Sequence, residues 1–329
     1  MQFKKQIYFI ILVLLIFTTG CKRNVITGDI FLLSEILSVK DNFRTIGYNL
    51  STKPQKTYLV TTDANSMILE QRFIGDELFM KGYANLDPNL VILFKTGNKQ
   101  SLLTLINEDG LVVKKQTLDF QAERLLLHPQ GGYVIPGYDS ADKPAVITLD
   151  AFWEPSKIIH LKGKYLFDAV LTEGRLTYVS MDDEGSKCHI YTGNMEPFYE
   201  FDNPNGSNCS LTTLRNMIQL HYQSSSKELV VVSFNILNRL ETTERHKIEK
   251  ADYFDVTLAS DDSFYYITHT VGKRSHSAVY RLKNRELNKI TSPELKNSLL
   301  TKPYDFEDTL LSVAYNPANT IKNRIVELK

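Results

Sequence analysis

Short apolar runs and polar turns alternate along most of this chain. The runs are rich in β-branched and aromatic residues, and seventeen Tyr and seventeen Phe are available to them. Turn signals such as "EDG", "PQGG", "DDEG" and "NPNG" separate the runs. This pattern predicts β-strands joined by tight turns. Helical signals are confined to two segments, 33–43 with Ser34 as N-cap and 292–300 with Pro293 in the first turn.

The same order of four strands returns several times. It is clearest in four segments, Tyr83–Leu118, Glu123–Leu161, Phe167–Phe201 and Phe254–Ile290. Comparable places in their second strands are marked by a set of anchor residues, Ile92, Val134, Tyr178 and Tyr265, which lie 42, 44 and 87 residues apart. The last step is close to two periods, and a further copy with Val231 near its second strand lies inside it. Another copy, anchored near Leu59, precedes the first.

A repeat of roughly 40–45 residues with four strands is typical of a β-propeller blade. Stacking such blades in a ring buries both faces of sheets that are too thin to stand alone. We therefore predict an all-β, seven-bladed β-propeller as a single domain over residues 21–329. The last copy, from residue 304, lacks an obvious fourth strand, so we expect the N-terminal strand Val25–Ser34 to complete it and close the ring. A pair of β-sandwiches is the alternative architecture.

The first residues differ from the rest of the chain. Lys4 and Lys5 precede an uninterrupted apolar run, Ile7–Phe17, and small residues follow it. A positive start, an apolar core and a small-residue cleavage zone are the parts of a secretory signal peptide. The apolar run is shorter than the roughly 20 residues that a membrane-spanning helix needs.

The residues that end this leader, "TTGC" at 18–21, resemble the lipobox of bacterial lipoproteins, although Thr18 stands where that family usually has leucine. The resemblance implies cleavage after Gly20, a signal peptide over residues 1–20 and acylation of Cys21, which would attach the protein to a membrane of the bacterial cell envelope. Lys22, rather than aspartate, follows the cysteine and resembles the outer-membrane signal of enteric bacteria. An ordinary secreted protein with a chance cysteine is the alternative.

Two cysteines remain after Cys21, namely Cys188 and Cys209. An even pair in an exported protein predicts a disulfide, because the bacterial envelope is oxidising. In the predicted blades Cys188 begins a third strand and Cys209 follows a fourth, so the two are expected to meet at one rim. The bridge would contribute on the order of 3 kcal/mol. Two buried thiols are the alternative.

The charge balance and the lack of known catalytic motifs exclude several functional classes. Lys plus Arg and Asp plus Glu are both 38, so no basic excess indicates nucleic-acid binding. The sequence contains no nucleophile elbow, zinc-protease or P-loop motif. His246, His269 and His276 lie in one blade region and could converge, but they lack metal-ligand spacing. We therefore predict no catalytic, cofactor or metal site.

The repeats resemble bacterial periplasmic propellers, whose blades often contain an L-x-x-DG turn; "LINEDGLVVKKQ" at Leu105–Gln116 is the best match. One member of that class is a scaffold lipoprotein of the outer-membrane assembly machinery. This resemblance favours a lipid-anchored, protein-binding scaffold rather than an enzyme. The alternative is a glycan-binding or glycan-cleaving propeller. An exposed apolar rim would favour the scaffold, and an acidic, aromatic channel mouth would favour the glycan protein.

Overall fold

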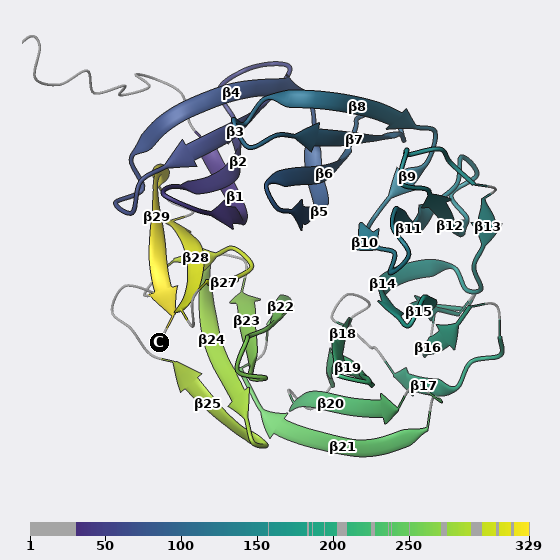
Figure 1. Ribbon diagram of the computed structural model, residues 1–329. Helices are drawn as coiled ribbons and strands as arrows, with labels where there is room; N and C mark the ends of the chain where they lie inside the picture. The colour runs from purple at the N-terminus through teal and green to yellow at the C-terminus, as the bar shows by residue number, and fades with distance from the viewer. Residues whose placement is uncertain are drawn as a thin grey trace, which may run out of the picture.

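The chain folds into a ring of β-sheets around a central opening (Figure 1). The computed structural model describes residues 31–328 except 157, 183, 186, 194, 203–208, 225–227, 236, 238, 250, 271–274, 291–297, 307–308 and 317–318. Over these residues the regular structure consists of 29 strands in seven antiparallel sheets. The predicted seven-bladed β-propeller is thus confirmed.

The strands follow the chain from blade to blade. Blades 1 to 4 contain β1 (Phe31–Val39), β2 (Phe43–Asn49), β3 (Lys56–Thr62) and β4 (Ile68–Asp76); β5 (Phe79–Leu86), β6 (Asn89–Lys95), β7 (Ser101–Ile106) and β8 (Val112–Leu118); β9 (Gln121–Ala122), β10 (Leu126–Leu127), β11 (Tyr133–Tyr138), β12 (Pro144–Leu149) and β13 (Ile159–His160); and β14 (Tyr165–Thr172), β15 (Arg175–Met181), β16 (Lys187–Thr192) and β17 (Tyr199–Asp202). Blades 5 to 7 contain β18 (Cys209–Leu214), β19 (Met217–Gln223), β20 (Glu228–Asn235) and β21 (Leu240–Lys247); β22 (Tyr253–Leu258), β23 (Phe264–Thr270), β24 (His276–Lys283) and β25 (Glu286–Ile290); and β26 (Leu299–Leu300), β27 (Tyr304–Phe306), β28 (Thr309–Asn316) and β29 (Asn319–Leu328).

The repeats read from the sequence correspond to blades 2, 3, 4 and 6 within a few residues. The four main anchors, from Ile92 to Tyr265, all lie in second strands, in β6, β11, β15 and β23. Leu59 and Val231 were assigned one strand too early, because they lie in the third strands β3 and β20. In a blade both middle strands are apolar on both faces, so the pattern alone did not separate them.

The core lies between neighbouring blades. The middle strand β6 is buried along nearly its whole length, whereas the outer strand β21 alternates between exposed and half-buried side chains. Leu93 of blade 2 packs in one cluster with Phe120 and with Ile135 of blade 3. Each sheet therefore buries its faces against the next one, as the repeat pattern requires.

The helix predicted over 33–43 is wrong, since most of this segment forms β1. Its apolar residues Leu33, Ile36 and Leu37 have the i, i+3, i+4 spacing of a helix face. Two register shifts in β1, between Leu33 and Ile36 and between Ile36 and Ser38, allow these side chains to be buried from a strand. Of the second predicted helix, Leu299–Leu300 form β26 and residues 292–297 lie outside the described residues.

The predicted ring closure is also wrong. The described part of the N-terminal strand, Phe31–Ser34, belongs to β1 and pairs with β2 of its own blade. Blade 7 is built from C-terminal strands alone: β26 and β27 both pair with one edge of β28 and form an interrupted inner strand, and β29 pairs with the other edge. Residues 25–30 lie outside the described residues.

Side-chain packing closes the ring instead. Leu33, Ile36 and Val60 of blade 1 form a buried cluster with Val313 of blade 7. The backbone N–H of Ile325 in β29 also donates a hydrogen bond to Ser66 Oγ, at 2.6 Å, in the last turn of blade 1. Blades 7 and 1 are therefore held together by the same means as the other neighbours, without a shared strand.

Polar side chains also link consecutive blades. In five junctions an oxygen of one blade accepts the backbone N–H of the inner strand of the next. The pairs are Tyr48 Oη with Met80, Ser101 Oγ with Ala122, Tyr138 Oη with Leu166, Asp168 Oδ2 with Leu211, and Ser277 Oγ with Leu300, at 2.8–3.1 Å. These bonds satisfy donors at places where an inner strand has no neighbour on its channel side.

The predicted Cys188–Cys209 disulfide is not present. The two residues do meet, because they pack in one apolar cluster between blades 4 and 5. Burial raises the pKa of the Cys209 thiol well above its ordinary value, and Cys188 and Asp168 add to the rise. A thiol held in its protonated form lacks the thiolate that disulfide formation requires.

Candidate functional site

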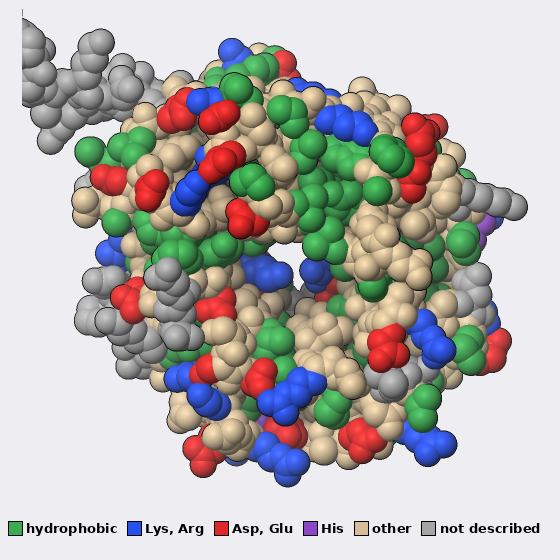
Figure 2. Space-filling model, in the orientation of Figure 1, with side chains coloured by type: hydrophobic (Ala, Val, Ile, Leu, Met, Phe, Trp, Pro, Cys, Tyr) green, Lys and Arg blue, Asp and Glu red, His purple; other side chains and the backbone are tan. Residues whose placement is uncertain are grey.

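The inner strands of the blades surround a cavity of about 580 Å³ at the centre of the ring. Side chains from six blades line it, those of blades 1, 2, 3, 5, 6 and 7. In the face drawn in Figure 2, basic side chains are visible at the wall of the opening, and hydrophobic side chains gather beside it over blade 2. The cavity is therefore a polar channel that passes through an apolar scaffold.

Three charged residues of the channel wall are paired across blades. Glu123 of blade 3 forms ion pairs with Lys81 and, at 4.0 Å, with Lys95 of blade 2. Arg124 Nη2 lies 2.5 Å from Asp168 Oδ1 of blade 4. These pairs neutralise charges that a narrow channel would otherwise leave poorly solvated.

Asp168 is the most enclosed of these groups, with 1% of its side chain exposed. Its second oxygen accepts hydrogen bonds from Ser210 Oγ and from the backbone N–H of Leu211, at 2.9 and 2.8 Å. One carboxylate thus joins blades 3, 4 and 5. This number of donors accounts for a buried charge without any catalytic role.

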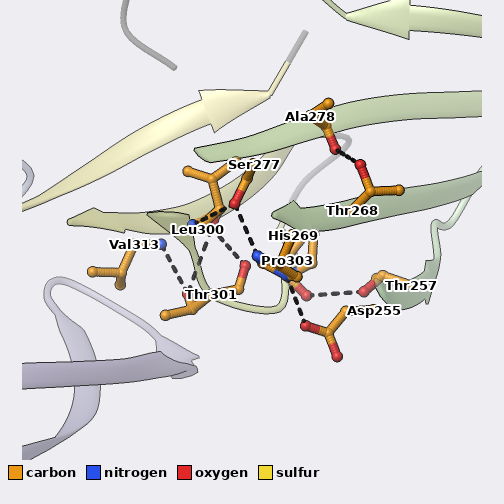
Figure 3. Close-up of polar contacts among 11 residues, drawn as sticks. Asp255, Thr257, Thr268, His269, Ser277, Ala278, Leu300, Thr301, Pro303 and Val313 are labelled. Atoms are coloured by element: carbon orange, nitrogen blue, oxygen red, sulfur yellow. Dashed lines mark hydrogen bonds and ion pairs between the residues drawn. The ribbon is translucent and has the colours of Figure 1, made fainter. Parts of the chain in front are cut away.

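An Asp–His–Ser array extends outward from the channel through blade 6 (Figure 3). Asp255 of β22 lines the cavity, and its Oδ2 lies 3.3 Å from His269 Nε2 of β23. His269 Nδ1 lies 2.9 Å from Ser277 Oγ of β24. Ser277 Oγ accepts the N–H of Leu300, so its own hydrogen can be donated to His269.

Asp, His and Ser are the residue types of a hydrolase triad, but here the aspartate, rather than the serine, is the residue that reaches the cavity. Ser277 is buried at the junction with blade 7, and the end that reaches the cavity is Asp255. A nucleophilic serine must be accessible to the substrate. The array therefore acts as a polar connection between blades 6 and 7 rather than as catalytic machinery.

The three histidines of this region do not converge. His246 lies near Glu244 and His276 near Glu249, whereas His269 belongs to the array above. No group of three or more potential metal ligands occurs within the described part of the chain.

Glu35 and Lys302 face the same cavity from the adjoining inner segments of blades 1 and 7. Neither takes part in the ion pairs of the channel wall. Burial raises the pKa of Glu35, and Asp255 contributes to the rise, while Lys302 acts in the opposite direction. Burial also raises the pKa of the neighbouring Tyr48 to about 12. The channel thus contains one carboxylate and one ammonium group that influence each other without forming an ion pair.

The sequence predictions missed these channel residues, although a signal for them exists. One polar residue recurs in each inner segment at steps of 42 to 47 residues: Glu35, Lys81, Arg124, Asp168, Ser210, Asp255 and Lys302. In β1, β5 and β14 a register shift lies at or next to this residue, and in blades 3 and 7 the inner strand is interrupted there. Such irregularities re-aim side chains, which explains how a polar residue reaches the channel from an otherwise apolar strand.

A second feature lies on one face of the disc. The chain enters every blade on one face, here called the entry face, and the turns between third and fourth strands lie on the opposite face. Five consecutive blades expose a large hydrophobic side chain in that turn. The five residues, here called the apolar arc, are Met67, Leu111, Phe152, Met195 and Leu237, and they are 51–78% exposed.

Short polar residues hold the turns of the arc in place. Asp63, Asn107, Asp150 and Asn235 each begin such a turn, and the Oδ1 of each accepts one or two backbone N–H groups within it. The turn backbone is therefore fixed by local hydrogen bonds. The hydrophobic side chains are not needed to stabilise these turns, and their exposure calls for another explanation.

No protein-family model and no curated protein matches the chain. Many solved structures share the fold, including two propeller domains and part of a prolyl endopeptidase. The β-propeller domain of Cps50 (Swd1) from Myceliophteria thermophila is 11% identical, with a TM-score of 0.58, and the match covers 91% of this chain and 100% of that one. The propeller domain of the trilobed protease from Pyrococcus furiosus, which has an open velcro topology, is 11% identical, with a TM-score of 0.58 and coverages of 91% and 96%. A prolyl endopeptidase is 10% identical, with a TM-score of 0.57; the match covers 90% of this chain and half of that enzyme. At these identities the likeness shows the fold alone.

Proposed function

We propose that this protein is a lipid-anchored lipoprotein of the bacterial cell envelope whose propeller binds another envelope protein. The apolar arc is the observation that carries the protein-binding part of this proposal. Each of five consecutive blades presents one large exposed hydrophobic side chain at the same turn and on the same face, and exposed hydrophobic side chains that share a face can form an interaction surface. A disc that presents these turns, four of them fixed by side-chain hydrogen bonds, offers such a surface at little entropic cost.

The anchor rests on the leader sequence. Cys21 lies outside the described residues, and among the described residues no helix is long and apolar enough to cross a membrane. Nine residues separate Cys21 from Phe31, which starts β1 on the entry face. Fully extended, this segment spans at most about 35 Å. Acyl chains on Cys21 would hold the entry face toward the bilayer and turn the apolar arc toward a partner.

The glycan-cleaving alternative is less well supported by the channel. Glycoside hydrolysis uses two carboxylates, one as proton donor and one as nucleophile or base. Glu123 and Asp168 are held in ion pairs with basic side chains, and Asp255 contacts His269. Among the carboxylates of the described cavity lining, Glu35 alone lies outside such contacts, so a second free carboxylate is missing. Because basic groups line the cavity together with these carboxylates, the channel mouth is not the acidic site that a glycan enzyme favours.

The test is affinity purification of the full-length protein from solubilised envelopes, followed by binding measurements with any partner found. Phe152→Asp and Leu237→Asp would place charges in the arc. We expect each to weaken partner binding at least about tenfold. Leu50→Asp is the matched control, because Leu50 is an exposed leucine in a turn on the entry face. The affinity of the Leu50→Asp variant for the partner should stay unchanged.

Two further results bear on the proposal. Cys21→Ser should release the protein from the membrane fraction, and an unchanged distribution would contradict the anchor. If no stoichiometric partner is recovered, or if the pure protein consumes a polysaccharide, the scaffold proposal fails.

A further inference from the structure

The central cavity has the composition of a ligand site that is separate from the apolar arc. We propose that it binds a small zwitterion, an α-amino acid or a dipeptide, with the ligand ammonium held between the carboxylates of Glu35 and Asp255 and the ligand carboxylate held by Lys302. This inference does not depend on the proposed function, because it concerns other residues and another kind of ligand.

The charges that remain after internal pairing define the ligand class. Lys81 is neutralised by Glu123, and Arg124 by Asp168. Glu35 and Lys302 remain, together with Asp255, whose one described polar partner is His269. A polyanion such as a nucleotide would meet two carboxylates here, and a polycation would meet an ammonium group. A ligand that carries one charge of each sign is complementary to all three groups.

Position supports the same assignment. Glu35, Asp255 and Lys302 line the same cavity from the inner segments of blades 1, 6 and 7, and these three blades follow one another around the ring. Yet no Glu35–Lys302 ion pair forms within 4.0 Å, although both side chains are long. A ligand inserted between them would supply the partner that each lacks and would be held at both of its ends.

The remaining wall suits the uncharged part of such a ligand. Tyr83 and Phe254 contribute aromatic surface, and Met80 and Leu125 contribute aliphatic surface. The volume of about 580 Å³ lies within the range of small-molecule sites. It exceeds the needs of a single small amino acid, so room remains for a large side chain or a second residue.

The experiment is isothermal titration of the purified chain with free L-amino acids and dipeptides. For the tightest probe, the N-acetylated form removes the ammonium and the amide form removes the carboxylate charge. We expect at least one zwitterion to bind, and each modified form to bind at least about tenfold more weakly. These comparisons use the unaltered protein and do not depend on the folding of variants.

Variants then assign the two ends. Glu35→Gln should weaken the zwitterion at least tenfold and leave the affinity for the N-acetylated form nearly unchanged. Lys302→Met should do the same while leaving the amide form unchanged. Glu286→Gln and Lys143→Met are controls, because both residues are exposed outside the channel. The proposal is overturned if no zwitterion binds below about 10 mM, if the modified forms bind as well as the parent, or if variants with an unchanged melting temperature retain full affinity.

Discussion

His221 is a fully buried histidine that the fold holds in its neutral form. It lies in β19, where Nε2 is 2.8 Å from Thr212 Oγ1 and Nδ1 is 3.0 Å from Tyr266 Oη of blade 6. Burial lowers the pKa of His221 to about 3 from its ordinary 6.5. An imidazolium would have to give up hydration that this apolar junction does not replace.

This histidine should make the protein less stable in mild acid. Between pH 6.5 and about 3 the unfolded chain takes up a proton that the folded chain refuses. The free energy of unfolding should therefore fall as the pH falls, by about 2 kcal/mol from this group between pH 7 and pH 5. Urea unfolding at the two pH values measures the drop. His221→Gln should reduce the drop by that amount. His128→Gln is the control, since His128 is half-buried in a surface turn, and it should leave the drop unchanged. Equal drops in all three proteins would show that His221 protonates in the folded state.

Asp168 should be the carboxylate whose removal costs the most. Asp168→Ala would leave Arg124 without its partner and the N–H of Leu211 without an acceptor. Breaking a fully buried pair costs about 3–5 kcal/mol of unfolding free energy. Because 37% of the Arg124 side chain is exposed, the loss here should lie at the lower end of that range. Glu196→Ala, which breaks an exposed pair with Lys162, should cost at most about 1 kcal/mol. Chemical denaturation at pH 7 distinguishes the two, and similar losses would refute the structural role of Asp168.

The sequence carried part of this residue-scale information. The period of the blades places a polar residue in each inner strand, so the positions of Glu35 and Asp255 follow from spacing. Their partners do not, because pairs such as Arg124 with Asp168 join different blades and depend on side-chain direction. The expected disulfide failed for the same reason: spacing brings Cys188 and Cys209 together, but burial of the thiol is a property of the packed blades.

At the scale of strands and turns, the first turn of blade 3 tolerates glycine alone. Gly132 has φ +82°, and a Cβ built there would lie 2.2 Å from the carbonyl oxygen of Leu149 in the neighbouring strand. Gly174, in the same turn of blade 4, has a similar φ of +76° but open space around it. The two positions separate backbone strain from steric overlap.

Alanine substitutions should therefore differ in cost. In Gly174→Ala the main cost is that of placing alanine in a left-handed backbone conformation, about 1 kcal/mol of unfolding free energy. Gly132→Ala adds a clash with a backbone atom that cannot move freely, so the loss should reach about 2–5 kcal/mol. Thermal unfolding of both variants measures the difference. If Gly132→Ala is no more destabilising than Gly174→Ala, strand β12 moves away more easily than the structure indicates.

Strands could be predicted from the sequence where their pattern of buried and exposed side chains follows the pattern of hydrophobic and polar residues. Outer strands such as β21 alternate, and middle strands such as β20 are continuous apolar runs. The prediction failed at β1, where register shifts give a strand the apolar spacing of a helix. Bulges are set by the pairing with β2 and by the channel, and neither is visible in a local stretch of sequence.

At the scale of the molecule, the junction between blades 7 and 1, here called the seam, is the one at which the described chain does not pass from one blade to the next. The sequence period predicted the number of blades but not the closure, because that depends on whether the chain ends pair or pack. Among the described residues, the cluster between blades 7 and 1 has four buried members, against seven to fourteen at the other six junctions. Seven further hydrophobic side chains pack against this cluster but are only partly buried, so most of the apolar contacts at this seam stay accessible to solvent, unlike those of the other junctions.

The seam should therefore open before the rest of the ring. Native-state hydrogen exchange in low denaturant should show amides of β2 and β28, the middle strands beside the seam, exchanging at lower free energies than those of β6 and β19. Val313→Ala, which removes buried volume at the seam, should lower protection in β28 and leave β19 unchanged until global unfolding. If instead all middle strands exchange together in the parent and in the variant, the disc unfolds as one cooperative unit, and the packed seam is as strong as the covalently connected junctions.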